Sequence, residues 1–234
     1  MTDILMAETK AAPDFRGITY WVFDLDHTLY TMNAEQEHAT EERICQFVQR
    51  HFGLPREEAW AIQKRFLLDH GTTLAGLMEK THHPVDPDLY HDEINDLDAL
   101  ELKPDPALRK GLARLPGQLL VFTNNCGRFA RGVLSRLGVE DLFHGVVDTK
   151  AMGFVPKPRA AAYAALLAQS GLRPERAALF DDSPRNLVPA HAMGMKTVWF
   201  NHGRGLSRMA IADPHLHIDH ETDDLASFLQ SIRV

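Results

Sequence analysis

Short apolar runs alternate with longer helical patterns along most of this chain. The apolar runs predict strands at 18–24, 118–123, 144–148, 177–181 and 196–200, with a further edge strand at 215–219. Helical spacing is found near 126–137, 158–170 and 184–193, and each of these segments is followed by a glycine, Gly138, Gly171 or Gly194. This alternation is typical of parallel strands joined by crossover helices. We therefore predict an α/β chain built on a doubly wound parallel sheet.

The alternation stops between residues 31 and 103. Glu, Gln, His and Leu continue there at helical spacing without a convincing strand. Pro55 follows Leu54 where a proline favours the first position of a helix, and later prolines mark turns. We expect a core domain made of residues 1–30 and 104–234, with a small helical cap domain, residues 31–103, inserted after the first strand.

Composition and charge narrow the classes of function. The chain has 234 residues, of which 44% are hydrophobic and 24% charged, enough apolar material for a sizeable core. Its formal net charge is -7 and it has no basic run, so neither a nucleic-acid polymer nor a membrane is an expected partner. The N-terminus lacks a leader pattern, and no stretch approaches the ~18 apolar residues that span a bilayer. With two cysteines, Cys45 and Cys126, predicted to be reduced thiols, we expect a cytoplasmic protein.

Polar side chains stand at the carboxyl ends of three expected strands: Asp24 and Asp26, Thr123 and Asn124, and Asp181 and Asp182. Lys157 lies between two prolines, whose stiff backbone fixes the direction of its ammonium group. Each feature alone has a plainer interpretation, because Asp, Asn and Thr often cap helices and most lysines are exposed. In a doubly wound sheet, however, the strands' carboxyl ends border one crevice. We therefore predict that these groups converge.

The chemistry of the converging groups indicates a metal-dependent hydrolase. Two adjacent acids at the end of a buried strand are costly unless a cation neutralises them. Oxygen ligands without His or Cys at metal spacing favour Mg²⁺ over zinc. A divalent ion with Lys and Thr beside it holds a phosphoryl group. One carboxylate can then attack phosphorus to form an aspartyl-phosphate, while a second protonates the leaving alcohol and deprotonates water.

The motif DLDHT, the Thr after the second strand, the Lys and the motif FDDS together resemble the haloacid dehalogenase (HAD) superfamily of phosphohydrolases. The resemblance implies a HAD-like Rossmannoid core, with Asp24 as the nucleophile and Asp26 as the general acid and base. It implies Thr123 and Lys157 as phosphate-binding residues, and we add Asn124 to them. The implied Mg²⁺ ligands are Asp24, Asp26 through its backbone carbonyl, Asp182 directly, and Asp181 directly or through water.

Four segments are similar, more narrowly, to the pyrimidine 5'-nucleotidase subgroup: residues 71–77, 88–91, 102–105 and 180–186. This resemblance implies nucleoside monophosphates such as UMP and CMP as substrates. One departure is His27, where the subgroup usually has Asn. Because a cap that closes over a site excludes water and adds contacts, four cap residues are substrate candidates: Thr72, Thr73, Tyr90 and His91. The alternatives are that Thr72 and Thr73 only start a helix and that Tyr90 only packs.

Other functions compete with the nucleotidase. The substrate of the same enzyme class can instead be a sugar phosphate or phosphoglycolate, and sequence alone does not rank these. A dehalogenase is disfavoured, because Asp26 would have no leaving alcohol to protonate. A non-catalytic phosphate-responsive module, akin to a signalling receiver domain, also uses Asp, Thr, Lys and an acidic pair, but in a different order and without a large cap. The expected partner is thus a small phosphate ester, and the pattern carries no signal for an oligomeric state.

Overall fold

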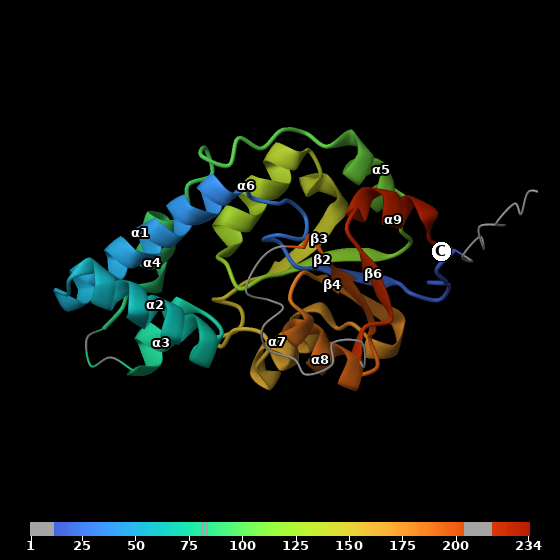
Figure 1. The fold of residues 1–234 in the computed structure, drawn as a ribbon. Coiled ribbons are helices and arrows are strands. Elements are labelled where there is room, and N and C mark those ends of the chain that lie inside the picture. Colours follow the sequence, from blue (N-terminus) through green and yellow to red (C-terminus); the bar gives the residue numbers. More distant parts are fainter. Residues whose placement is uncertain (1–11, 81, 83, 204–216) are drawn as a thin grey trace, which may run out of the picture.

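The sheet of this protein is parallel throughout (Figure 1). In the computed structural model, which describes residues 12–80, 82, 84–203 and 217–234, the strand order is β3-β2-β1-β4-β5-β6. The strands are β1 (Tyr20–Phe23), β2 (Gln118–Phe122), β3 (Phe143–Val147), β4 (Ala177–Asp181), β5 (Lys196–Phe200) and β6 (His220–Thr222). The doubly wound parallel sheet expected from the sequence is confirmed.

Both faces of the sheet are buried because the central strands are apolar at nearly every position. In β1, Trp21 and Phe23 point into one apolar cluster and Val22 into another, since successive side chains of a strand alternate between faces. β2 divides in the same way, with Val121 in the first cluster and Phe122 in the second. Continuous apolar runs of this kind are what a sheet covered on both faces requires.

Helices cover the two faces unequally. The first cluster includes side chains of α5 (Pro106–Ala113), α6 (Gly127–Leu137) and α9 (Leu225–Ser231), and the second includes α7 (Ala160–Ser170) and α8 (Pro184–Ala192). Figure 1 shows these two groups on opposite sides of the strands. Two short 3-10 helices, η1 (Glu140–Leu142) and η2 (Pro174–Arg176), precede β3 and β4. Within the described segments, no helix is long and apolar enough to cross a membrane.

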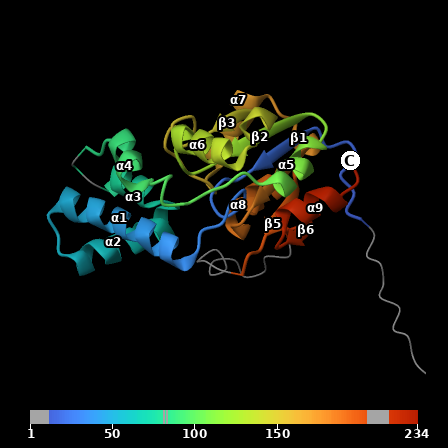
Figure 2. The same ribbon diagram turned by 90° about the horizontal axis from the view of Figure 1, so that it is seen from above.

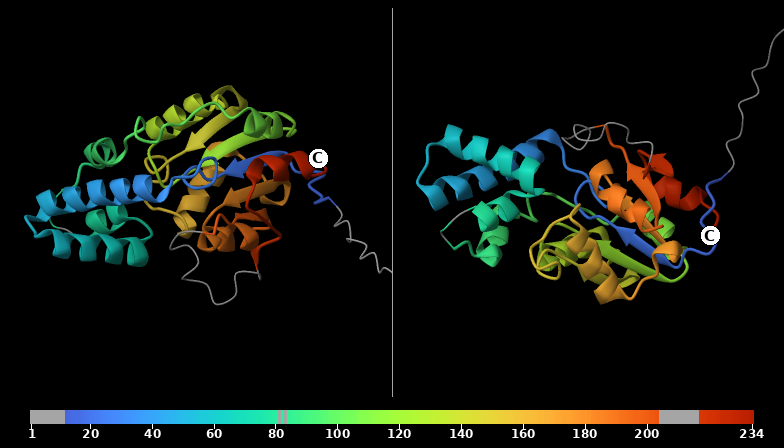
Figure 3. Two further views of the ribbon diagram at one scale, coloured as in Figure 1. Left: turned by 45° about the horizontal axis from the view of Figure 1, so that its top comes forward. Right: turned by 90° about the horizontal axis from the view of Figure 1, so that it is seen from below.

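The remaining helices form a helical insert, which leaves the sheet after β1: α1 (Ala34–Phe52), α2 (Arg56–His70), α3 (Thr73–Lys80) and α4 (Pro87–Ile94). They lie together at one end of the molecule, beside the sheet rather than on its faces (Figures 2 and 3). Their apolar residues pack into a separate cluster that includes Phe47, Phe66 and Leu77. The ion pairs that join this insert to the core include Glu79 with Arg159 and Asp92 with Arg128.

Two local expectations need correction. The predicted edge strand at 215–219 is wrong: residues 215 and 216 lie outside the described residues, and the last strand begins at His220. The reason is that the Asp219 carboxylate accepts hydrogen bonds from the Thr197 amide (2.8 Å) and hydroxyl (3.1 Å). The Thr197 amide is thus bound by a side chain, and the pairing with β5 begins at His220, opposite Val198. Pro55 is the residue before α2 rather than its first residue.

Gly117 gives a test of this sheet. It adopts φ +95°, and a Cβ atom there would lie 2.2 Å from the Thr19 carbonyl oxygen, a backbone atom that binds Gln118 and begins the β1–β2 pairing. Gly117→Ala is expected to lower the free energy of unfolding by more than about 3 kcal/mol, since clash and left-handed strain add. Gly171, at φ +63° with nothing within 4 Å, is the control, and Gly171→Ala should cost only about 1 to 2 kcal/mol. Urea denaturation measures both, and equal losses would contradict the prediction.

Candidate active site

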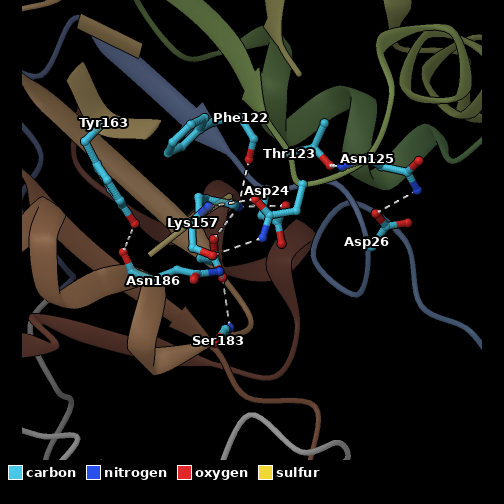
Figure 4. A network of polar contacts seen from close by, with 11 residues as sticks. Asp24, Asp26, Phe122, Thr123, Asn125, Lys157, Tyr163, Ser183 and Asn186 are labelled. Carbon is cyan, nitrogen blue, oxygen red and sulfur yellow. Dashed lines mark hydrogen bonds and ion pairs between the residues drawn. The ribbon is translucent and has the colours of Figure 1, made fainter. Parts of the chain in front are cut away.

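The carboxyl ends of three neighbouring strands meet at one place. β1 pairs with β2 on one side and with β4 on the other, so the residues that follow them are brought together. Figure 4 shows Asp24, Thr123 and Lys157 around this point. The predicted convergence of side chains at the strand ends is therefore present, with Lys157, Asp181 and Asp182 close to Asp24.

Lys157 connects these strand ends through its ammonium group. Its Nζ lies 2.9 Å from Asp24 Oδ1 and donates hydrogen bonds to Asp181 Oδ2 (2.7 Å) and the Phe122 carbonyl oxygen (2.8 Å). The side chain is 1% exposed. Burial by itself would lower the pKa of Lys157, but the charges of Asp181 and Asp24 outweigh it and raise the pKa, so the group stays protonated.

The loop that carries Lys157 is held by Asn124. The Asn124 side chain accepts a hydrogen bond from the Lys157 amide (2.8 Å) and donates one to the Lys157 carbonyl (3.3 Å). Asn124 therefore fixes the loop that carries Lys157, and its phosphate-binding role stays a prediction. Thr123 is fully buried, and its hydroxyl accepts from the Asn125 amide at 3.0 Å.

Three carboxylates form a compact acidic cluster beside the ammonium. Asp24, Asp181 and Asp182 each offer an oxygen, and these atoms lie within 4.8 Å of one another. Burial raises the pKa of Asp24; Lys157 opposes this rise, whereas Asp181 and Asp182 add to it. One ammonium therefore does not balance the cluster. A hard divalent cation such as Mg²⁺ fits the oxygen donors and the surplus negative charge.

The members of this cluster differ in how their oxygens are occupied. Asp181 Oδ1 accepts from the Ser183 amide and from Asn186 Nδ2, both at 2.9 Å, while its Oδ2 binds Lys157. Asp182 is partly exposed, and its Oδ2 lies 3.5 Å from His202 Nε2. Both Asp181 oxygens are thus held by protein donors, which suits a supporting place, whereas the more exposed Asp182 suits a direct one.

Asp26 is turned away from the acidic cluster. Its carboxylate accepts hydrogen bonds from the Tyr30 hydroxyl and from Asn125 Nδ2, the latter at 3.3 Å. Asn125 in turn exchanges two amide hydrogen bonds with Asn95, at 2.9 and 3.2 Å, in the segment that follows α4. Figure 4 shows Asp26 beside Asn125, apart from Lys157. The two acids of DLDHT therefore have separate surroundings and are suited to separate roles.

A cavity of about 320 Å³ lies between the strand ends and the helical insert. Asp26 and Asn124 line it from the core. The four cap candidates named from the sequence line it from the insert: Thr72, Thr73, Tyr90 and His91. Asp24, Lys157 and Asp182 are not among its lining residues. The structure thus brings the cap candidates together around the edge of the acidic site.

The plainer interpretations of the cap candidates also hold in part. The Thr72 hydroxyl accepts from the Ala75 amide at 3.1 Å, as a residue that starts a helix does. Tyr90 is buried and packs edge-on against Phe47, with ring centroids 5.0 Å apart. His91 Nε2 lies 3.3 Å from the Thr149 hydroxyl, and burial lowers the pKa of His91, which keeps the ring neutral.

His27, the departure from the nucleotidase pattern, has an unusual backbone and an aromatic neighbour. Its φ is 59°, in the left-handed region. Its ring stacks on His202, with centroids 5.4 Å apart and an interplanar angle of 19°. His27 Nδ1 lies 3.7 Å from Glu37 Oε1 in α1. The two imidazoles therefore connect Asp182 of the acidic cluster with Glu37 near the start of the helical insert.

Several residues of the site were not predicted from the sequence: Tyr30, Asn95, Asn125, Asn186 and His202. Asn186 lies five residues after Asp181 in the first turn of α8, where a side chain reaches back to the strand end; this spacing is a usable signal. Tyr30 likewise follows Asp26 by four residues. Asn95 and His202 belong to segments that are far in the sequence from the residues they contact, so no local pattern predicts their place in the site.

Comparisons with known proteins agree with this geometry. A family model for haloacid dehalogenase-like hydrolases matches residues 19–194. Among solved structures, a predicted phosphoglycolate phosphatase from Haemophilus somnus has a TM-score of 0.60 at 19% identity, covering 92% of this chain and 97% of that one. The L-2-haloacid dehalogenase from Xanthobacter autotrophicus has a TM-score of 0.53 at 16% identity, covering 91% and 97%. At these identities the likeness establishes the fold.

A curated relative comes from yeast. Phosphate metabolism protein 8 of Saccharomyces cerevisiae is 29% identical over 189 residues, which are 74% of this chain and 58% of the yeast protein. This chain thus spans little more than half of that relative's length. Because the family model extends from β1 through α8 and so includes every strand end of the site, the chain belongs to the haloacid dehalogenase-like hydrolases.

Proposed function

We propose that this protein is a Mg²⁺-dependent phosphomonoester hydrolase that acts through an aspartyl-phosphate on Asp24. The supporting observation is the imbalance of charge at the strand ends, where three carboxylates within 4.8 Å face one buried ammonium. A bound Mg²⁺ would supply the missing positive charge and neutralise phosphate oxygens. Asp24, Asp182 and, in support, Asp181 are the side chains that would hold it.

Lys157 and Asp26 would carry out the remaining steps, which are the positioning of Asp24 and the transfer of protons. Lys157, fixed by Asp181 and the Phe122 carbonyl, holds the Asp24 carboxylate in one orientation for attack on phosphorus. Its positive charge favours the ionised, nucleophilic form of that carboxylate. Asp26, bound by Tyr30 and Asn125 outside the acidic cluster, gives its proton to the leaving alcohol and later takes one from water.

The placement of Asp26 favours a phosphatase over a dehalogenase. Asp26 lines the cavity where a leaving alcohol would depart, and a departing halide needs no proton. Three clustered carboxylates are also without purpose in a reaction that has no phosphate charge to neutralise. These features support phosphoester hydrolysis in this chain, although dehalogenases share its fold.

For the substrate, we propose a pyrimidine nucleoside 5'-monophosphate such as UMP or CMP. The cavity beside Asp26 is at the small end of the range for small-molecule sites, about 300 to 1,000 Å³, and is walled by Leu67, Leu74 and Ile94. Such a space suits a planar base whose faces pack against aliphatic side chains. The alternatives are a sugar phosphate and phosphoglycolate, the second being named for the Haemophilus somnus structure.

Replacement of the proposed nucleophile tests the mechanism. Asp24→Asn is expected to lower kcat for p-nitrophenyl phosphate by about 10³-fold or more, because an amide cannot supply the attacking oxygen. The matched control is Asp69→Asn, at an exposed position of α2, which should keep kcat within about twofold. Steady-state kinetics with Mg²⁺ measures both, and a turnover by Asp24→Asn close to that of the control would contradict the assignment.

Removal of the metal tests the cofactor. Phosphate release from p-nitrophenyl phosphate, UMP, CMP and AMP should cease in EDTA and return when excess Mg²⁺ is added, because the acidic cluster would otherwise repel the phosphate. A colorimetric phosphate assay with and without chelator makes the comparison. Activity that is indifferent to EDTA would defeat the proposal.

The buried carboxylate also predicts a pH dependence of stability. Burial raises the pKa of Asp24 in the folded, metal-free protein, an effect that Lys157 only partly offsets. Because the folded state then keeps a proton that the unfolded chain releases above about pH 4, the stability due to Asp24 falls as pH rises through this window. As pH is raised from about 4.5 to 7.5, Asp24→Asn should therefore gain stability relative to wild type. Urea denaturation in EDTA at both pH values measures the free energy of unfolding of each protein. A loss of stability by Asp24→Asn relative to wild type at the higher pH would contradict the prediction.

A further inference from the structure

Gln63, in the middle of α2, has a buried amide with one unused hydrogen-bonding atom. The residue is 2% exposed and lines the cavity between the insert and the strand ends. Its Nε2 donates to the Glu41 carbonyl oxygen at 3.1 Å. Its Oε1 is enclosed and accepts a hydrogen bond from no atom in the described part of the chain.

The orientation of this amide follows from its partner. The Glu41 backbone oxygen can only accept a hydrogen bond, so the amide nitrogen must face it and the oxygen must face the other way. The position of the residue is fixed as well, because the Thr73 hydroxyl donates to the Gln63 carbonyl at 3.3 Å and joins α2 to α3. A buried acceptor left without a donor costs about 1 to 3 kcal/mol, which a ligand with a suitable donor would recover.

The rest of the cavity wall limits what such a ligand can be. His91, on α4, also has a buried nitrogen, Nδ1, without a hydrogen-bond partner among the described residues. The insert lines the rest of the cavity with the aliphatic side chains of Ile44, Leu67 and Leu74 and with polar side chains that include Glu41, Thr72, Thr73 and Asp96. A group with one or two polar edges and flat apolar faces matches this wall. A carboxylate does not, because it would place negative charge against the Gln63 oxygen in a cavity that acidic side chains also line.

We propose that Gln63 Oε1 is a specificity determinant that accepts a hydrogen bond from an N–H group on the base of a nucleoside monophosphate substrate. This inference rests on the proposed function and narrows it. Both uracil, through its ring imide, and cytosine, through its exocyclic amine, carry such a donor. Phosphoglycolate has an acceptor carboxylate in place of this donor.

The test removes the donor from the substrate and the acceptor from the enzyme in turn. CMP is compared with the 2-pyrimidinone riboside 5'-monophosphate, which is CMP without its amine, on wild type and Gln63→Met. Wild type should prefer CMP by about tenfold in kcat/KM, the effect of one buried hydrogen bond. In Gln63→Met this preference should fall below about twofold, with the loss on the CMP side.

Two controls separate this role from a structural one. Gln46→Met, at an exposed position of α1, should keep the wild-type preference. p-Nitrophenyl phosphate has no N–H donor, so Gln63→Met should hydrolyse it within about twofold of the wild-type rate; if this variant does not fold, Gln63→Leu takes its place, and circular dichroism verifies either one.

The outcomes distinguish the two proposals. If p-nitrophenyl phosphate is hydrolysed only with Mg²⁺ but the preference for CMP is equal in wild type and Gln63→Met, the role of Gln63 is overturned and the phosphatase stands. The role is also overturned if wild type shows no preference. If no ester is hydrolysed with Mg²⁺, the proposed function fails and the role of Gln63 fails with it.

Discussion

The site depends on the contacts that the buried ammonium group of Lys157 makes. It is buried where β1, β2 and β4 end, and it binds the Asp24 carboxylate, the Asp181 carboxylate and the Phe122 carbonyl at once. Without it, two buried acids would face each other with no compensating charge, an arrangement that costs several kcal/mol. The parallel sheet makes this contact possible, because only neighbouring parallel strands bring three carboxyl ends to a single point.

The sheet also explains why these polar groups can be buried. Residues such as Val22, Phe122 and Phe180 fill both faces so completely that the strands behave as a rigid frame. The polar side chains begin where the frame ends, and each is then held by a backbone group or an amide, as Asn124 holds the Lys157 loop. Free energy from apolar burial thus offsets the cost of gathering like charges at the strand ends.

Sequence patterns predicted most of the frame, because strand and helix signals are local. The Asp24 and Asp181 positions followed from apolar runs that end in acids, and the helix ends at Gly138 and Gly171 followed from left-handed caps. The edge strand was misplaced because Asp219 uses its side chain for a bond that a strand would make with its backbone. Edge strands have weak apolar patterns, so such a shift leaves little trace in the sequence.

The surroundings of the site were less predictable than its centre, because they depend on contacts between distant segments. In the sequence, Gln63 is an ordinary polar residue of a helical segment. Its burial results from the packing of α1, α2 and α3, which the local pattern does not indicate. His202 meets Asp182 and His27 through the end of β5, far from either in the chain. In contrast, motif residues are recognisable because the chemistry needs the same types at the same strand ends.

The reciprocal amide pair of Asn95 and Asn125 has a consequence for how the helical insert can move. The ion pairs Glu79–Arg159 and Asp92–Arg128 also join the insert to the core, but exposed ion pairs weaken as ionic strength rises. The two amides are uncharged, so their strength is almost independent of salt and of proton concentration. High salt would therefore weaken the ion pairs of the insert while the Asn95–Asn125 hydrogen bonds next to Asp26 persist. The amide pair is thus the point about which these helices would rotate relative to the core.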